Sequence, residues 1–511
     1  MKTKNFFTAN LLGNVLSLVA GVLITFAFAP LQLYVLAIII PALLFALWQN
    51  ITPAKAFLRG WLFGLGMFGA GIYWVFISIH TFGNASILLA GFFTATLIAI
   101  LAIFPGLTGY FLNRYFSRPT RSRIFYAFPA IWVFLEWIRS WIFTGFPWLL
   151  LGYSQINSPL KGYASIIGVY GLSLLVLFSS SLLIQIYINI KQKQYSNNLF
   201  YFFMLVLLWS VGAYLNTISW THAFGKPIKV SLVQGNIPQD IKWSSDSIQP
   251  TLDTYRQLTK PHWDSSIIVW PESAIPLPLQ NAEDFLNDID KIAKKHQAAF
   301  ITGIPVRVPG TQNYYNAVIT LGNGEGYYLK RRLVPFGEYT PFHRQLHKLL
   351  DILNVPMSDF VPATDRSPPL VANNIKIAAF ICYEIAFPEM VLSRDSNINM
   401  LLTVSNDAWF GRSVAQAQHL EMAQMRAAEN GRPVLFVANN GITAVINAQG
   451  KIQSAAPPYT AYVLTDTVQP TRGSTPWQSL GMDPVLFLMV MLILFAIREQ
   501  RSMRLKNTEK T

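Results

Sequence analysis

Long apolar stretches are the feature that most constrains the fold of this chain. An α-helix needs about 20 apolar residues to cross the hydrocarbon core of a bilayer. Seven such stretches precede residue 220, and an eighth lies near the C-terminus. The expected spans are residues 9–29, 31–49, 56–79, 86–112, 125–143, 164–189, 199–218 and 482–497. Because 52% of the 511 residues are apolar and only 13% are charged, the sequence predicts a multi-span α-helical membrane bundle rather than a soluble protein.

Basic residues occur in alternate loops between these spans. The net charge of +14 is therefore explained by cytoplasmic loops facing anionic lipid, and it does not indicate a nucleic-acid partner. The opposite short loops contain little basic charge beyond Lys161. The positive-inside rule predicts cytoplasmic termini and places residues 220–480 outside, on the opposite side of the membrane. The basic residues on the predicted cytoplasmic side are Lys2, Lys4, Lys55, Arg59, Arg114, Arg118, Arg121, Arg123, Lys191, Lys193, Arg498, Arg501, Arg504, Lys506 and Lys510.

The first span has an alternative interpretation as a secretory signal peptide. Lys2 and Lys4 precede an apolar run that ends in the A-x-A-like sequence Ala27-Phe28-Ala29. The run is longer than the apolar region of a typical signal peptide, and another span follows at once, so a membrane helix is favoured. Cleavage would leave the sidedness of the later segments unchanged.

Between about residues 227 and 470 the long apolar stretches are replaced by short apolar runs separated by Pro, Gly and Asn. Helical patterns at 282–296 and 413–430 alternate with these runs, which is typical of an α/β layered fold. We expect a seven-helix bundle at 1–220, an extramembrane domain at 221–475, and an eighth helix with a basic tail at 476–511. The predicted strands are Ile228–Gln234, Ile267–Trp270, Ala298–Ile304, Asn316–Leu321, Ile375–Cys382, Asn399–Val404, Pro433–Ala438 and Ala444–Asn447.

Three reactive side chains stand beside the apolar runs of this domain. Glu272 follows a predicted strand, Lys330 begins a basic cluster, and Cys382, the only cysteine, ends another predicted strand. Each has a structural explanation when taken alone: a helix cap or first-turn residue for Glu272, a solvated cation for Lys330 and a small core residue for Cys382. Zinc-ligand spacing, a Walker loop and a G-x-S-x-G motif are absent from the sequence, which weakens metal, nucleotide and serine-hydrolase interpretations.

Together the three side chains meet a known chemical need. A thiol is only partly ionised at neutral pH, so a nucleophilic cysteine requires a base or a nearby positive charge. Glu272 is a candidate to accept the thiol proton and return it to a leaving group. Lys330 is a candidate to stabilise the thiolate and the oxyanion of a tetrahedral intermediate.

The segments around these residues resemble the Glu-Lys-Cys signature of the nitrilase, or carbon-nitrogen hydrolase, superfamily in order and spacing. Further segments resemble the apolipoprotein N-acyltransferase family of the bacterial inner membrane, and this resemblance extends over nearly the whole chain. The segments that resemble the superfamily are Trp270-Pro271-Glu272-Ser273, Lys330 with Leu333-Val334-Pro335-Phe336-Gly337-Glu338, and Cys382-Tyr383-Glu384. Those that resemble the acyltransferase family are Val233-Gln234-Gly235-Asn236-Ile237-Pro238-Gln239 with Trp243, Ser405-Asn406-Asp407-Ala408-Trp409-Phe410-Gly411, Asn439-Asn440-Gly441, Glu136-Trp137-Ile138-Arg139 and Gly145-Phe146-Pro147-Trp148.

The resemblance implies an α-β-β-α sandwich and a two-step acyl transfer that uses no metal or organic cofactor. Cys382 would take an acyl chain from a phospholipid such as phosphatidylethanolamine, and the amine of a diacylated apolipoprotein would then attack the thioester. Glu272 would act as general base and acid, with Lys330 supporting the oxyanion. The expected supporting or substrate-binding residues are Glu338, Tyr383, Glu384, Trp243 and Trp409.

Other interpretations of the sequence stay open. A membrane-tethered nitrilase that hydrolyses a small amide or nitrile would use the same triad, and a transporter or lipid-binding protein would carry an inactive domain. Residues 342–354 have leucines at helical spacing, which is typical of a helix packed on the core or of an interfacial arm that gates lipid access. The aromatic residues near Trp148 suit either membrane anchoring or a substrate channel.

Overall fold

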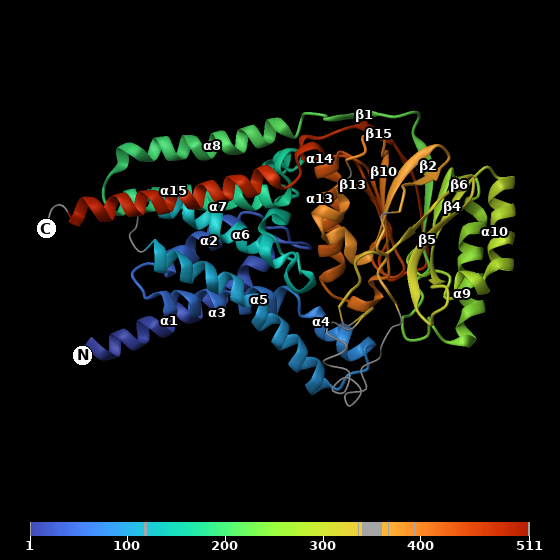
Figure 1. The fold of residues 1–511 in the computed structure, drawn as a ribbon, viewed down its shortest axis with the longest axis horizontal. Coiled ribbons are helices and arrows are strands. Elements are labelled where there is room, and N and C mark those ends of the chain that lie inside the picture. The colour runs from blue at the N-terminus through green and yellow to red at the C-terminus, as the bar shows by residue number, and fades with distance from the viewer. Residues whose placement is uncertain are drawn as a thin grey trace. The chain divides into compact units, whose positions relative to one another are not determined.

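The computed structural model describes residues 2–116, 120–335, 337–339, 360–365, 367–392 and 394–508 (Figure 1). It divides into two compact units. The bundle unit comprises Met1–Tyr73, Gly91–Ile218 and Leu480–Thr511, and the sheet unit comprises Trp74–Ala90 and Ser219–Ser479. The predicted amphipathic segment 342–354 lies outside the described residues.

Apolar helices build the bundle unit. Among the described residues, four helical segments are long and apolar enough to cross a membrane, or five if the bent pair Pro53–Gly71 and Trp74–Phe82 forms one span. Expected segment 31–49 contains the 12-residue helix α2, and segment 125–143 contains the 12-residue α6, which directly follows the π-helix Arg123–Ala127. Segment 482–497 overlaps α15, which begins at Asp483 and ends in a charged segment. The α-helices of this unit are α1 (Lys2–Ile24), α2 (Leu36–Leu47), α3 (Pro53–Gly71), α5 (Ile87–Tyr115), α6 (Phe128–Arg139), α7 (Ala164–Lys191), α8 (Asn198–Leu215) and α15 (Asp483–Thr508). The short α4 (Trp74–Ile77) and the first residues of α5 belong to the sheet unit.

Glycines allow helices of the bundle to approach closely. A Cβ atom built on Gly21 of α1 would lie 1.9 Å from the carbonyl oxygen of Phe63 in α3, and one on Gly66 of α3 would lie 2.2 Å from that of Leu18. Small residues at such crossings bring helix backbones into van der Waals contact, which drives association where lipid removes the hydrophobic effect.

The charged residues of α6 are buried and paired with polar groups of the bundle. Arg139 donates from Nη1 to the carbonyl oxygens of Phe146 and Trp148, at 2.7 Å each. Glu136 accepts at Oε1 from the backbone N–H of Leu151 at 3.1 Å. These bonds satisfy ionisable groups that would be costly to leave unpaired in an apolar bundle.

Two mixed β-sheets form the centre of the sheet unit. Within the described chain one sheet has the order β14-β2-β3-β4-β5-β7 and the other the order β13-β12-β11-β10-β9-β8-β6. The strands of the first sheet are β2 (Ile228–Gln234), β3 (Ile267–Val269), β4 (Ala299–Arg307), β5 (Tyr314–Gly322), β7 (Tyr327–Leu329) and β14 (Tyr462–Val468). Those of the second are β6 (Gly324–Glu325), β8 (Leu370–Ala372), β9 (Ile375–Ile381), β10 (Met400–Ser405), β11 (Val434–Ala438), β12 (Ala444–Ile446) and β13 (Ile452–Ala455). A separate antiparallel pair joins β1 (Thr221–Ala223) to β15 (Thr471–Gly473).

Three apolar layers hold the sheets and helices together. Alternate residues of the central strands, such as Ile377 and Ala379 of β9, face a core between the two sheets. The outer face of the first sheet packs on α9 (Ser245–Thr259) and α10 (Glu283–Lys295), while the outer face of the second packs on α13 (Ala415–Asn430) (Figure 1). The predicted α-β-β-α sandwich is confirmed.

The central strands end close to the positions expected from the sequence. β2 has the predicted bounds, and the other predicted strands overlap β3, β4, β5, β9, β10, β11 and β12. The prediction was wrong about the end of β9, because the strand stops at Ile381 and Cys382 begins a turn. The φ angle of Cys382 is 52°, a left-handed conformation that cannot continue a β-strand.

Gly303 of β4 provides a test of how tightly the sheet positions the neighbouring loop. A Cβ atom at this position would lie 2.5 Å from the Ser273 nitrogen and 2.7 Å from the Glu272 Cα. We expect Gly303→Ala to displace this loop, because both contacts are with backbone, and to lower the free energy of unfolding by about 1–3 kcal/mol. Chemical denaturation measures the change. Gly91→Ala, which introduces a methyl group where no atom lies within 4 Å, is the control, and equal stability of the two variants would contradict the prediction.

Candidate active site

Cys382 occupies a strained turn at the end of β9. It is 8% exposed, and its left-handed backbone costs a non-glycine residue about 1–3 kcal/mol unless surrounding contacts hold it. The short 3₁₀ helix Cys382–Ala386 follows directly. The strand carries the residue through the core and the turn then presents its side chain at the strand end, where parallel β10 and β11 also end.

Glu384 holds this turn from one side. Its carboxylate is fully buried and accepts from the backbone N–H of Ile381 at 2.9 Å and from the Tyr328 hydroxyl at 2.8 Å. The other oxygen accepts from the backbone N–H groups of Arg331 and Arg332, at 2.8 and 3.1 Å. Burial raises the pKa of Glu384, and the bonds from Ile381 and Arg331 oppose this effect. The carboxylate therefore ties the cysteine turn to the segment that carries Lys330.

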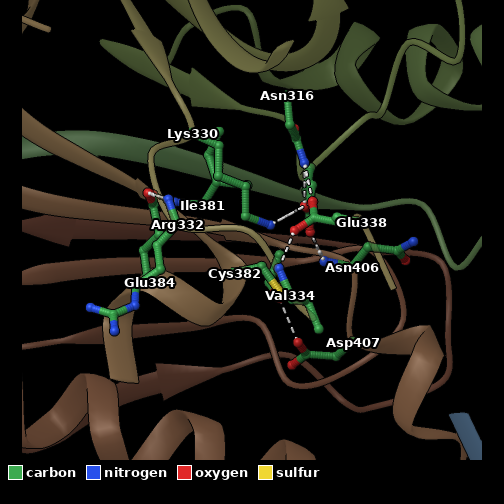
Figure 2. Close-up of polar contacts among 12 residues, drawn as sticks. Asn316, Lys330, Arg332, Val334, Glu338, Ile381, Cys382, Glu384, Asn406 and Asp407 are labelled. Carbon is green, nitrogen blue, oxygen red and sulfur yellow. Dashed lines mark hydrogen bonds and ion pairs between the residues drawn. The ribbon is translucent and has the colours of Figure 1, made fainter. Parts of the chain in front are cut away.

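Lys330 lies between two carboxylates in the buried interior. Its Nζ atom is 2.8 Å from Oε1 of Glu338 and 3.3 Å from Oε1 of Glu272. The side-chain amide of Asn316, on β5, donates to the same two oxygens at 3.1 and 2.7 Å. Figure 2 shows Lys330 and Asn316 pointing toward Glu338, with Cys382 at the other side of the cluster. Two carboxylates thus share one cation and one amide.

Three separated segments position Glu272. Its Oε2 atom accepts from the backbone N–H of Asn406 at 2.8 Å, just beyond the end of β10. Asn439 donates to the Asn406 side chain at 3.0 Å and accepts from the backbone N–H of Ile237 at 3.0 Å. The motifs around Ile237, Asn406 and Asn439 therefore meet in space and fix one oxygen of Glu272, while Lys330 and Asn316 contact the other.

Lys242 places a second buried cation beside the site. It is 1% exposed, and its ammonium group donates to the backbone carbonyl oxygen of Glu272 at 3.0 Å. Burial lowers the pKa of Lys242 to about 8, against the opposing effect of Glu272. The ammonium group therefore carries its charge at neutral pH and helps to balance the buried carboxylates.

The charges around the thiol set its protonation in the resting site. Burial raises the pKa of the Cys382 thiol well above its ordinary value, and Glu272 raises it further, whereas Lys330 lowers it. Burial alone would lower the pKa of Lys330, but Glu272 and Glu338 outweigh it and raise that pKa. The lysine is therefore a permanent cation. The thiol needs a proton acceptor at the moment of attack, and the arrangement suits a cysteine nucleophile assisted by a carboxylate base.

The structure brings Glu272, Lys330, Glu338 and Glu384 into one connected cluster with the turn of Cys382. Tyr383 is buried and packs edge-on against Phe387, with ring centroids 4.9 Å apart.

The structure places the contacts of the two expected tryptophans outside the triad. Trp243 is 48% exposed, and Trp409 packs on Phe82 and accepts at its carbonyl oxygen from Ser78 at 2.7 Å. Among the described residues, neither tryptophan makes a hydrogen bond or ring contact with the triad.

Sequence reasoning missed Asn316 and Lys242 as site residues. Asn316 is the first residue of a predicted strand, and Lys242 is the neighbour of Trp243. A polar residue that begins an apolar strand is a weak signal, and nothing in the sequence shows that Lys242 is buried. Over the part of the chain that the structure describes, no group of three or more His, Cys, Asp or Glu side chains could hold a metal ion.

Glu384→Gln tests the support of the cysteine turn. The glutamine amide would direct N–H groups toward donors that now meet a carboxylate oxygen, so we expect the free energy of unfolding to fall by about 2–4 kcal/mol. Chemical denaturation would measure the loss. The exposed Glu325→Gln on β6 is the matched control, and a Glu384 variant as stable as this control would show that the four bonds do not hold the turn.

Comparisons with known proteins agree with this architecture. A family model for the apolipoprotein N-acyltransferase N-terminal domain matches residues 20–182, and one for carbon-nitrogen hydrolases matches residues 229–476. An apolipoprotein N-acyltransferase of Coxiella burnetii is 43% identical over 484 residues, covering 94% of this chain and 99% of the relative. One from Methylococcus capsulatus is 40% identical over 474 residues, covering 93% of each chain.

A carbon-nitrogen hydrolase superfamily protein of Xanthomonas campestris is among the solved structures that match. It is 20% identical with a TM-score of 0.37, covering 48% of this chain and 91% of that protein. The two apolipoprotein N-acyltransferases, by contrast, match in both the helical and the sheet region over nearly their whole length. This membrane protein is therefore an enzyme of the apolipoprotein N-acyltransferase family.

Proposed function

We propose that this enzyme transfers an acyl chain from a phospholipid, through a thioester on Cys382, to the N-terminal amine of diacylglyceryl-cysteine on an apolipoprotein. The observation that carries the proposal is the meeting of Glu272, Lys330 and the turn of Cys382 in one buried cluster. The names of the relatives support an apolipoprotein as the acyl acceptor.

In the first step the thiol of Cys382 attacks the ester carbonyl carbon of the phospholipid while Glu272 takes the thiol proton. Lys330 stabilises the negative charge on the oxygen of the tetrahedral intermediate. When the intermediate collapses, the ester C–O bond breaks and the leaving alkoxide takes the proton from Glu272. The products are a thioester on Cys382 and a lysophospholipid.

In the second step the neutral amine of the apolipoprotein attacks the thioester carbonyl carbon. Glu272 accepts a proton from the attacking nitrogen, the C–S bond breaks, and the cysteine sulfur takes that proton. The product is an amide, and the enzyme returns to its starting protonation state. Glu338 keeps Lys330 oriented by its 2.8 Å ion pair through both steps.

Both proposed substrates carry acyl chains, which gives a reason for an apolar helical bundle in the same chain. The alternation of basic loops supports a multi-pass protein of the bacterial inner membrane with its catalytic domain on the periplasmic side. We assign this domain to residues 221–475, preceded by the bundle at 1–220 and followed by the last helix and basic tail at 476–511. An acyl-enzyme on the outer side could react directly with a membrane-anchored lipoprotein.

Substitution of the triad tests the assigned roles. We expect Cys382→Ala and Cys382→Ser to abolish formation of the amide product while the protein still inserts into the membrane, because the helices of the bundle do not depend on this side chain. Glu272→Gln and Lys330→Met should slow acyl-enzyme formation by at least about a hundredfold, the usual scale for general acid–base and oxyanion groups. Lys229→Met, at an exposed ion pair with Asp264, is the control. Normal turnover in any triad variant would remove that residue from the mechanism.

A stepwise incubation distinguishes transfer from hydrolysis. Purified protein given phospholipid alone should accumulate an acyl mass on the peptide that contains Cys382, and hydroxylamine should remove it, because a transferase must protect its thioester from water. Addition of a diacylated lipopeptide with a free N-terminal amine should then discharge the acyl group into an amide product, detected by mass spectrometry.

The alternatives give different products in the same incubation. Rapid release of free fatty acid without the lipopeptide would support a hydrolase in place of a transferase. A Cys382 peptide that stays unmodified with phospholipid and with lipopeptide would contradict both. The same lipopeptide with an acetylated N-terminus is the matched control, and it should leave the acyl-enzyme intact.

A further inference from the structure

A buried histidine lies directly behind the nucleophile. His419 of α13 and Asp407, which follows β10, both have fully buried side chains. The Nδ1 atom of His419 lies 3.1 Å from Oδ1 of Asp407, and its Nε2 atom lies 3.1 Å from the backbone carbonyl oxygen of Cys382. The imidazole ring therefore bridges an acidic side chain and the strained residue that carries the thiol.

The partners of the two ring nitrogens determine how many protons the pair contains. A carbonyl oxygen can only accept, so Nε2 must carry a proton to bond Cys382. A second proton is then needed between Nδ1 and Asp407, since two acceptors would otherwise face each other at hydrogen-bond distance. An aspartic acid is a stronger acid than an imidazolium, so this second proton belongs to the ring.

Asp407 has a second hydrogen-bond partner beside the thiol. Its Oδ1 atom also accepts from the Ser405 hydroxyl at 2.5 Å. The Ser405 side chain hydrogen-bonds the thiol as well and lowers the pKa of Cys382, whereas Asp407 raises it. A carboxylate this close to the thiol opposes formation of a thiolate unless a cation balances it.

We propose that His419 is a buried imidazolium, kept charged by Asp407, that positions Cys382 through its carbonyl oxygen and cancels the effect of the Asp407 charge on the thiol. His419 is a positioning residue, because it reaches the reacting sulfur only through the backbone of Cys382. Glu384 holds the same turn from the opposite side through the Ile381 N–H. Two buried side chains, Glu384 and His419, thus hold the left-handed conformation of Cys382.

Among the described residues, the elements packed against His419 carry the following titratable and charged groups. The 3₁₀ helix of residues 382–386 contributes the Cys382 thiol and Glu384, whose carboxylate accepts a hydrogen bond from the Tyr328 hydroxyl. The segment after β10 contributes Asp407, while the rings of Phe410 and Phe436 meet the imidazole edge-on. β11 and β12 contribute apolar residues. On α13 itself, Glu421 is buried, and Glu429 pairs with Arg426.

The single cysteine permits a test that does not depend on acyl transfer. The rate of alkylation by iodoacetamide, followed by mass spectrometry of the full-length protein between pH 6 and pH 9, reports the thiolate of Cys382 alone. We expect His419→Gln to slow alkylation about tenfold at each pH, because an unbalanced Asp407 carboxylate then faces the thiol and a tenfold change corresponds to one pKa unit. His222→Gln, at an exposed histidine of β1, is the matched control and should react like the unsubstituted protein.

A charge-cancelling double variant distinguishes this role from simple packing. In His419→Gln with Asp407→Asn the unbalanced carboxylate is gone, so alkylation should recover most of the lost rate even though more of the native network has been removed. If His419 only fills space, the double variant will react no faster than His419→Gln. That result, or alkylation of His419→Gln at the rate of the control, would overturn the proposal.

Asp407→Asn alone provides a second measurement if His419→Gln does not fold. A rotated Asn amide can donate to Nδ1 of a neutral imidazole, which keeps its Nε2–H bond to Cys382. We therefore expect an alkylation rate within about threefold of the unsubstituted protein, or half a pKa unit. A tenfold slower reaction would show that the thiol needs the carboxylate itself, and it would overturn the proposal. Because alkylation needs neither lipid nor lipopeptide, a failure of acyl transfer would leave this test intact.

Discussion

The site depends on the placement of opposite charges in a space that contains little water. Lys330 is 1% exposed and lies between Glu272 and Glu338, and a buried charge without such a partner would cost several kcal/mol. Asn316 shares both carboxylates, and Lys242 adds a second cation at the backbone of Glu272. The neighbouring sheets and loops must therefore keep these groups together, because separating them would leave a buried charge unpaired.

The fold meets this requirement by bringing strand ends together. β9, β10 and β11 are parallel neighbours in one sheet, and β2, β3 and β4 in the other. Cys382 and Asn406 follow two of these strands, while Glu272 follows β3. A rigid, apolar sandwich thus fixes the backbone on both sides of the cluster, and short turns present the reactive groups. This division between scaffold and site is typical of α/β enzymes.

The cysteine turn combines conformational strain with buried polar support. The left-handed backbone of Cys382 directs its side chain toward the Lys330 cluster, and Glu384 bonds the residue before it. His419 contacts its carbonyl oxygen from the other face of the sheet. Burial keeps the thiol protonated in the resting site. Attack is thereby coupled to proton transfer, which suits the acyl transfer proposed for this site.

The sequence by itself determined the features that depend on local pattern. Apolar length indicated the membrane helices, short apolar runs separated by Pro, Gly and Asn located the central strands with β2 at its observed bounds, and the positions of Glu272, Lys330 and Cys382 beside strands indicated the site. The tertiary structure alone decided which polar groups are buried together. Asn439 meets Ile237 from 202 positions away, and Lys242 and His419 are buried only because separate segments enclose them. Periodicity describes neighbours along the chain, whereas hydrogen bonds and charge burial depend on distances between segments far apart in it.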